Sequence, residues 1–253
     1  CMRTLFFLIL LTALLLSMAP VALAQSIDES ATEDEGGLGL TLNTVFCDKY
    51  LWRGINYDDG LIFQPEAVLS YDDFYFSLWG NIDLLNNNNI KSNEIDFALG
   101  YAHDFNSFGV ETYVSYFNYF YAPDENTGEI TIAAYLPVSD FTFFVNSSFD
   151  FLACAGSVFS EIGVDYEKEI SDQFSFYGTV NASLASSAYN DYYLELDKSA
   201  LNFVGANAGI SYSPMDGFSI NADFTLNINL DKDVKKELGN TSNLIQLTLT
   251  KEF

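Results

Sequence analysis

From Leu38 to its last residue, the chain alternates apolar and polar residues in successive segments of about ten residues. In the segment from Phe218 to Leu230, seven apolar residues alternate with six polar ones. The final segment, Leu244–Phe253, repeats the pattern and ends on an aromatic residue. Because successive side chains of an extended strand point to opposite faces, each segment has one apolar and one polar face. The period of two predicts strands through most of the chain.

The alternation predicts twelve strands, at residues 38–48, 62–71, 74–84, 93–104, 109–121, 129–138, 141–152, 157–170, 173–186, 200–213, 217–231 and 242–253. Five of the connections are short and rich in Asn, Asp, Ser or Gly, at residues 71–73, 105–108, 138–140, 170–173 and 213–217. Six alternate with these and are mostly longer, at residues 49–61, 85–92, 122–128, 153–156, 187–199 and 232–241.

This sorting of connections is typical of strands that pass up and down through a membrane, with short turns on one side and longer loops on the other. The sequence therefore predicts an all-β fold, a transmembrane antiparallel up-and-down β-barrel of about 12 strands. As the last of an even number of strands, Leu244–Phe253 should pair with strand 38–48 and close the barrel. A soluble periplasmic β-protein is the alternative, but a soluble sandwich has no reason to sort its connections in this way.

The N-terminus has the features of a secretory signal peptide. Arg3 precedes the apolar run Leu5–Leu16, and Ala22-Leu23-Ala24 supplies the small residues of a cleavage site. We expect a signal peptide at residues 1–24, a flexible acidic segment at 25–37 and the barrel at 38–253. A retained signal anchor is the other interpretation, and the acidic residues that follow Ala24 argue against it.

The net charge of −25 excludes a nucleic-acid-binding protein, which needs a basic surface. A chain that is 49% hydrophobic and 16% aromatic nevertheless has enough apolar surface to fold. After the signal peptide, no run of about 20 apolar residues could form a membrane-spanning helix. If the mature chain crosses a bilayer, it must do so with strands.

The sequence offers no catalytic, cofactor or metal site, so we predict that the protein is not an enzyme. The single histidine, His103, falls on the outward side of its strand and near a short turn, which suits an interface residue rather than a general base. One histidine and the scattered Cys47 and Cys154 cannot form a zinc site. The two cysteines fall on distant elements, so free thiols are favoured over a disulfide.

A short motif, Lys49-Tyr50-Leu51-Trp52-Arg53-Gly54-Ile55, follows the first predicted strand. Together with Phe63-Gln64-Pro65 and Leu78-Trp79-Gly80-Asn81, it resembles the TorF-type porins, a family of outer-membrane proteins of Gram-negative bacteria. The resemblance covers the first third of the chain and fades beyond about residue 125. It implies a barrel in the outer membrane, brings no catalytic residues and does not indicate a solute.

Arg53 is the only arginine after the signal peptide. It is expected to fold back onto the barrel mouth and pair with an acid such as Glu66 or Asp83. The alternative is a constriction inside the barrel that contacts an anionic or aromatic solute. Gly54 beside it permits a sharp change of chain direction.

If the apolar faces point outward, the opposite faces gather acids and almost no lysine, which predicts a pore that prefers cations. The candidate pore-lining residues are Arg53, Glu66, Asp83, Asp96, Glu111, Asp150, Glu161, Asp165 and Asp223. Three more acids also fall on the inward face of their segments but lie near strand ends, where we expect them to be solvated: Glu94, Glu167 and Asp231. Inward small residues, among them Gly205 and Gly209, are expected to leave room in the bore.

These observations predict an outer-membrane, porin-like channel for passive diffusion of small polar solutes that are cationic or neutral. The alternative is a plugged barrel with a structural or surface-adhesion role, closed by side chains or by residues 49–61. Expected partners are membrane lipid and lipopolysaccharide, and the barrel-assembly machinery through the C-terminal strand that ends at Phe253. Loop acids such as Asp58 and Asp59 could bridge to divalent cations, although solvated loop charge is favoured. The oligomeric state stays open.

Overall fold

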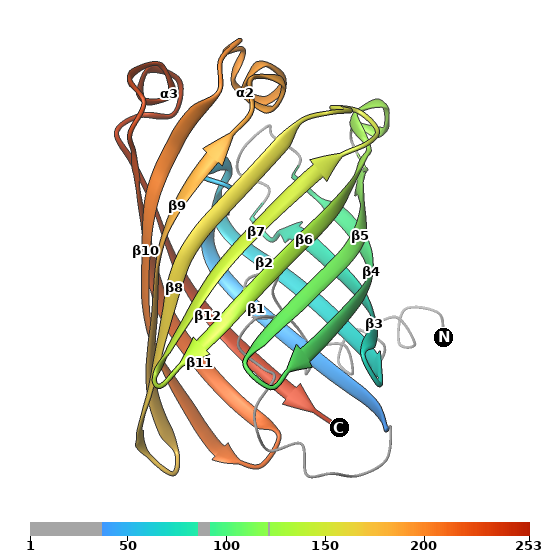
Figure 1. Ribbon diagram of the computed structural model, residues 1–253, viewed down its shortest axis with the longest axis vertical. Helices are drawn as coiled ribbons and strands as arrows, with labels where there is room; N and C mark the ends of the chain where they lie inside the picture. Colours follow the sequence, from blue (N-terminus) through green and yellow to red (C-terminus); the bar gives the residue numbers. More distant parts are fainter. Residues whose placement is uncertain (1–36, 86–91, 121) are drawn as a thin grey trace.

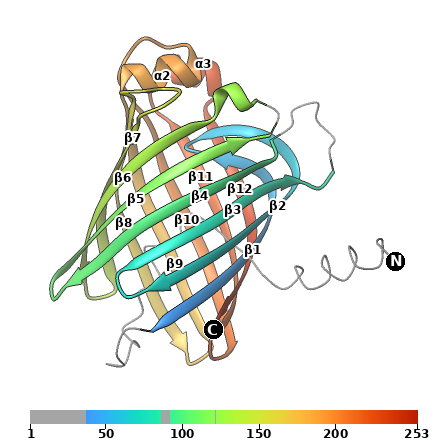
Figure 2. The same cartoon turned by 90° about the vertical axis from the view of Figure 1, so that its right-hand side faces the viewer.

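The computed structural model describes residues 37–85, 92–120 and 122–253. The predicted signal peptide and nearly all of the predicted acidic segment lie outside these residues. The described chain forms one closed barrel of twelve antiparallel strands, each paired with its neighbours in sequence (Figures 1 and 2). The strands are β1 (Leu38–Trp52), β2 (Ile55–Tyr71), β3 (Phe74–Asp83), β4 (Glu94–Phe105), β5 (Phe108–Tyr119), β6 (Thr127–Val138), β7 (Phe141–Asp150), β8 (Val158–Ser171), β9 (Phe174–Ala185), β10 (Ala200–Met215), β11 (Phe218–Asn229) and β12 (Thr241–Glu252).

The closure of the barrel is the predicted one. β12 pairs antiparallel with β1, in a register that runs from Thr41 opposite Glu252 to Cys47 opposite Gln246. Beyond the strand, the backbone N–H of Phe253 donates to the carbonyl oxygen of Leu40 at 3.0 Å. Because both neighbours of β1 and of β12 are strands, the ladder has no open edge.

The outer surface of the barrel is apolar. On β7, Phe141, Phe143, Val145 and Phe149 are each 41–50% exposed, whereas Ser148, on the other face of the strand, is buried. The same alternation recurs around the barrel, with apolar side chains on the outside and polar side chains on the inside. A water-soluble protein requires the opposite. An exposed apolar surface of this extent suits contact with lipid.

The connections are sorted between the two ends of the barrel, as the sequence predicts. The five predicted short turns and the C-terminus lie at one end (Figure 1). The opposite end carries helices α2 (Ser187–Leu194) and α3 (Lys232–Leu238), the short helix η1 (Pro123–Glu125) and the β1–β2 connection. We call these the turn end and the loop end. Among the described residues, no helix is both long and apolar enough to cross a membrane.

The prediction of a loop at residues 49–61 is wrong. β1 and β2 continue through this region and join in a two-residue turn at Arg53 and Gly54. Their φ angles are 50° and 82°, the positive values that a tight hairpin turn of this length requires. Register shifts between Cys47 and Lys49 and between Tyr50 and Leu51 interrupt the apolar-polar alternation, so the pattern gave no signal of a strand there.

Candidate pore

The inner wall of the barrel carries the predicted acids. Glu66, Asp83, Asp96, Glu111, Asp150, Glu161, Asp165 and Asp223 all lie on the face opposite the exposed apolar residues of their strands. On β4, for example, Phe97 and Leu99 are 41% and 61% exposed on the outside, so Asp96, one residue before Phe97, faces inward. The alternation therefore placed every predicted acid on the inner wall.

These carboxylates accept hydrogen bonds from neutral groups. Glu66 accepts from the Ser77 hydroxyl at 2.6 Å and from the Asn43 amide at 3.1 Å. The same kind of contact joins Glu111 to Tyr75, Glu161 to Asn181, Asp165 to Thr179 and Asp223 to Asn207, at 2.5 to 2.7 Å. None of the eight acids forms a salt bridge within the part of the chain that the structure describes. Their negative charge is thus left for whatever occupies the lumen.

Two of the eight acids bind backbone N–H groups of the connections at the loop end. Asp150 is 4% exposed and accepts hydrogen bonds from the Thr127 hydroxyl and from the backbone N–H groups of Leu152 and Cys154, so it fixes the β7–β8 connection. Asp83, at the end of β3, accepts from the backbone N–H of Leu85 at 2.9 Å. The acids along the bore itself are therefore Glu66, Asp96, Glu111, Glu161, Asp165 and Asp223.

The expectation that Glu94 and Asp231 are merely solvated at the rim is wrong. Glu94 is 2% exposed and accepts a hydrogen bond from the Tyr50 hydroxyl. Asp231 caps the N-terminus of α3 and binds the Lys198 ammonium at 2.8 and 2.9 Å. That hydrogen bond lowers the pKa of Asp231 and raises the pKa of Lys198. Glu167, by contrast, is exposed as expected.

Arg53 does not pair with Glu66 or Asp83. Its guanidinium donates two hydrogen bonds to the carboxylate of Glu129 on β6, from Nη1 at 2.7 Å and from Nη2 at 2.6 Å. The side chains of Arg53 and Glu129 are 14% and 4% exposed, so the ion pair is removed from water. This two-point geometry is the strongest form of an arginine–carboxylate contact.

Three aromatic rings surround the same guanidinium. Its Cζ lies 4.3 Å from the centre of the Trp52 ring, 4.8 Å from that of Phe159 and 5.9 Å from that of Tyr189. A cation over an aromatic face is attracted by the electron density of the ring, and more so where water is excluded. The rings come from β1, β8 and α2, so Arg53 joins the hairpin to the far side of the barrel.

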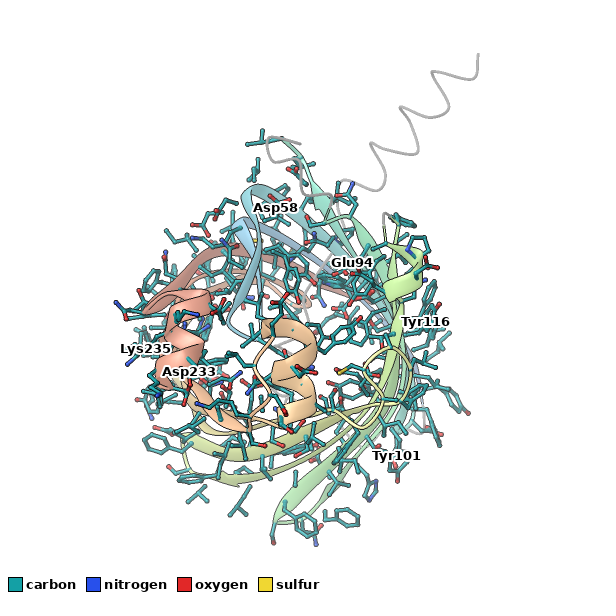
Figure 3. The ribbon with its side chains drawn as sticks, turned by 90° about the horizontal axis from the view of Figure 1, so that it is seen from above. Asp58, Glu94, Tyr101, Tyr116, Asp233 and Lys235 are labelled. Carbon is teal, nitrogen blue, oxygen red and sulfur yellow. The ribbon has the colours of Figure 1, made fainter. Side chains whose placement is uncertain are left out.

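The tip of the β1–β2 hairpin is thus held inside the loop end. A Cβ on Gly54 would lie 2.9 Å from the Phe203 ring of β10, so only glycine fits at this contact. Ile55 packs against an apolar cluster of Leu194, Ala200 and Val234. Seen from above, α2 lies within the ring of strands (Figure 3). The hairpin tip and α2 together narrow the loop end of the lumen.

The bore toward the turn end is arranged differently, with aromatic rings laid against its wall. The Tyr75 ring covers Gly100 on the neighbouring strand, where a Cβ would come within 2.1 Å of the ring. The same pairing joins Tyr135 to Gly109, Phe144 to Gly163 and Tyr177 to Gly209. The space expected at Gly209 is therefore filled by a neighbouring ring. Because these rings lie along the wall, they extend less toward the axis.

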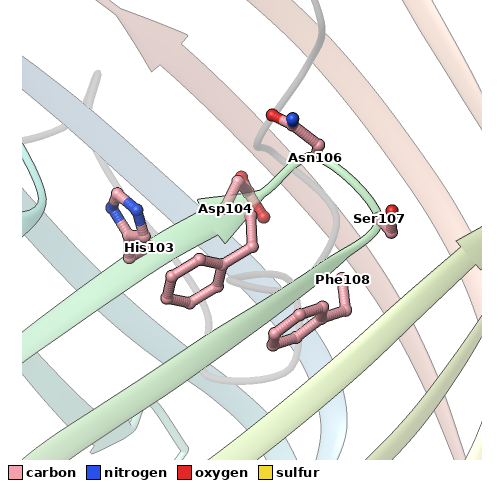
Figure 4. A pocket seen from close by; sticks show the side chains of 6 residues that line it. His103, Asp104, Asn106, Ser107 and Phe108 are labelled. Carbon is pink, nitrogen blue, oxygen red and sulfur yellow. The ribbon is translucent and has the colours of Figure 1, made fainter.

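Other groups weighed from the sequence lie apart from the lumen acids. His103 contacts Asp73 at 2.7 Å on the outside of the barrel. Beside it, a shallow depression of about 310 Å³ is formed by the β4–β5 turn, from His103 to Phe108 (Figure 4). Cys47 and Cys154 are free, as predicted, and both are buried. No group of three or more His, Cys, Asp or Glu residues suited to a metal occurs within residues 37–85, 92–120 and 122–253.

No protein-family model matches the sequence, and a search of curated proteins finds no match. Solved structures do match. The KdgM porin aligns with a TM-score of 0.53 at 10% identity, and the NanC porin with 0.52 at 9%, each over 85% of this chain and 99% of the porin. An outer membrane channel from Pseudomonas putida F1 aligns with 0.51 at 8% identity, over 89% of this chain and 99% of that one. At these identities the likeness shows the fold, which is that of outer-membrane porins.

Proposed function

We propose that this porin-fold barrel is an outer-membrane channel through which small polar solutes, cationic or neutral, diffuse passively. The observation that carries the proposal is the set of acids along the bore, which are bound by neutral donors and not by lysine or arginine. Rings of uncompensated carboxylates attract cations and repel anions in a narrow pore. Such a channel needs no catalytic residue.

The outer membrane as the location rests on three independent features. The exterior is a continuous apolar surface with phenylalanine on several strands. The N-terminus has the composition of a signal peptide. The motif around Trp52-Arg53-Gly54 resembles the TorF-type porins. The strand that ends at Phe253 is the proposed signal to the barrel-assembly machinery, and the ring of Phe253 is 69% exposed.

The charge of the lumen argues for a different solute from that of one structural relative. A KdgM porin has been solved in complex with disordered oligogalacturonate. A polyuronate carries a carboxylate on each sugar, and the acids of this bore would repel it. The one arginine near the mouth is already paired with Glu129. We therefore propose that acidic oligosaccharides are excluded.

A second candidate is a plugged barrel with a structural or adhesive role. It is favoured by the hairpin tip, which is packed against β8, β10 and α2 at the loop end. If this packing leaves no path for water, the acids of the bore would only hydrate a closed interior.

Conductance in planar lipid bilayers separates the two candidates. The channel proposal expects discrete openings and a reversal potential that shows cation preference in a salt gradient. The double variant Asp96→Asn/Glu111→Gln should reduce that preference, since it removes two charges and keeps the shape of both side chains. Openings that prefer anions would contradict the role of the acids. A protein that inserts and never conducts would establish the plugged barrel.

A further inference from the structure

Basic residues are concentrated on one element of the loop end. Helix α3 has seven residues, and three of them are Lys232, Lys235 and Lys236, in a chain with a net charge of −25. The other described connections at this end carry mainly acids, namely Asp124, Glu125, Asp191, Glu195 and Asp197. Helix α3 also contains two acids, Asp233 and Glu237, so it carries one more lysine than acid, whereas the other connections at this end are acidic. A net positive helix in so acidic a protein suggests an anionic partner.

The orientation of α3 follows from its buried residue. Val234 is 0% exposed and packs with Leu194 and Ala200 on the inner side of the helix. At about 100° per residue, Lys232 and Lys236 lie opposite Val234, and Asp233 and Lys235 lie on the two flanks. Viewed from above, Lys235 points away from the barrel, whereas Asp233 lies on the inner side (Figure 3).

The acids of the same segment are already engaged. Lys198 binds Asp231 and Asp233, each at 2.8 Å, and Lys236 contacts Glu237 at 3.1 Å. Lys232 and Lys235 form no salt bridge with any residue that the structure describes. Two ammonium groups of this helix therefore stay available to an external anion.

The height of α3 on the barrel matches a membrane surface. Ile228 and Leu230, which lead into the helix, are 46% and 40% exposed, and Ile245 on the adjoining strand β12 is 57% exposed. The lipid-facing apolar surface thus ends one turn or less from α3. Lipid headgroups begin where such a surface ends.

We infer that the lysines of α3 bind the phosphate groups of outer-leaflet lipopolysaccharide and so anchor this side of the rim. The inference rests on the proposed outer-membrane location, and it does not depend on conduction. Lys235 points away from the barrel, and Lys232 and Lys236 lie on the face of α3 opposite the buried Val234. Lysine binds phosphate as a flexible point charge, without the fixed geometry that arginine imposes.

Lipid A binding to the purified full-length barrel tests the inference, with native mass spectrometry as the readout. The variant Lys232→Gln/Lys235→Gln/Lys236→Gln should bind lipid A about 25-fold more weakly, at about fivefold for each of Lys232 and Lys235, the two lysines of α3 without an acidic partner among the described residues. Lys251→Gln is the matched control. It removes a lysine near the turn end of the barrel, so it should bind lipid A as the unchanged protein does.

The helix has to remain folded for the comparison to hold. Lys235→Gln alone keeps two of the three charges and should reproduce at least a fivefold loss. Equal lipid A binding by the triple variant and the unchanged protein would overturn the inference, and so would an equal loss in Lys251→Gln. Displacement of lipid A by inorganic phosphate at low concentration would point to a small-anion site and overturn the lipid assignment. Channel openings in bilayers should be the same in all of these variants, which keeps this test separate from that of the proposed function.

Discussion

The ion pair between Arg53 and Glu129 holds the hairpin tip, and Glu129→Gln tests this directly. The substitution keeps the size of the side chain and removes its charge. Arg53 would then remain a cation that is 14% exposed, surrounded by three aromatic rings and without a carboxylate. Removing one partner of a buried ion pair costs about 3–5 kcal/mol of stability, because the remaining charge stays desolvated and unpaired.

That cost favours a hairpin tip released from its site. At about 1.4 kcal/mol for each factor of ten, a loss of 3 kcal/mol lowers the ratio of docked to released tip by about 100-fold. The closed ladder of strands can remain intact, because the two-residue turn lies beyond the segments of β1 and β2 that pair with β12 and β3. The change should therefore be local to the tip.

Hydrogen exchange of backbone amides in residues 49–61, together with single-channel conductance, measures the release. In Glu129→Gln we expect faster exchange there and larger openings. The double variant Arg53→Met/Glu129→Met carries no buried charge and should exchange nearly as slowly as the unchanged protein. Asp165→Asn is the matched control, since its carboxylate accepts a hydrogen bond from the neutral Thr179 hydroxyl and lies in no salt bridge among the described residues. Unchanged exchange and conductance in Glu129→Gln would refute the role assigned to the ion pair.

Three further predictions concern other parts of the barrel. Gly100→Ala should push the Tyr75 ring off the wall and into the bore, which should lower the free energy of unfolding by about 1–3 kcal/mol and reduce the conductance. A variant with the same stability and conductance as the unchanged protein would contradict this role of Gly100. Because Lys198 lowers the pKa of Asp231, their contact stabilises α3 fully above the unfolded aspartate pKa of about 3.9 and is lost as pH falls through the lower folded value. The protection of the amides of residues 231–238 from exchange, measured relative to an unstructured peptide at the same pH, should therefore decrease as the pH falls below about 3.9. Deletion of Phe253 should impair assembly into the outer membrane, and normal insertion of the shortened chain would contradict the proposed role of this residue.

The residues of the inner wall could be predicted because the face that a residue takes depends only on whether its position along the strand is odd or even. Glu66, Glu111 and Asp223 were placed correctly from alternation alone. Glu129 was missed, although it alternates with the apolar Ile130 and Ile132 in the predicted strand at residues 129–138, so the same pattern contained the signal. Its partner could not be found in this way, because Arg53 and Glu129 are 76 residues apart and meet only across the mouth of the barrel.

The sequence by itself determined the number of strands, the sorting of turns and loops, the closure of the barrel and the two faces of its wall. Each of these follows from period-two alternation and from the composition of short segments. Tertiary structure alone decided the path of residues 49–61, the partner of Arg53 and the fit of Gly54 against Phe203. These depend on where opposite walls of a closed barrel bring distant side chains together. No local pattern encodes the separation of two residues on opposite walls, because it is set by the tilt and register of all twelve strands at once.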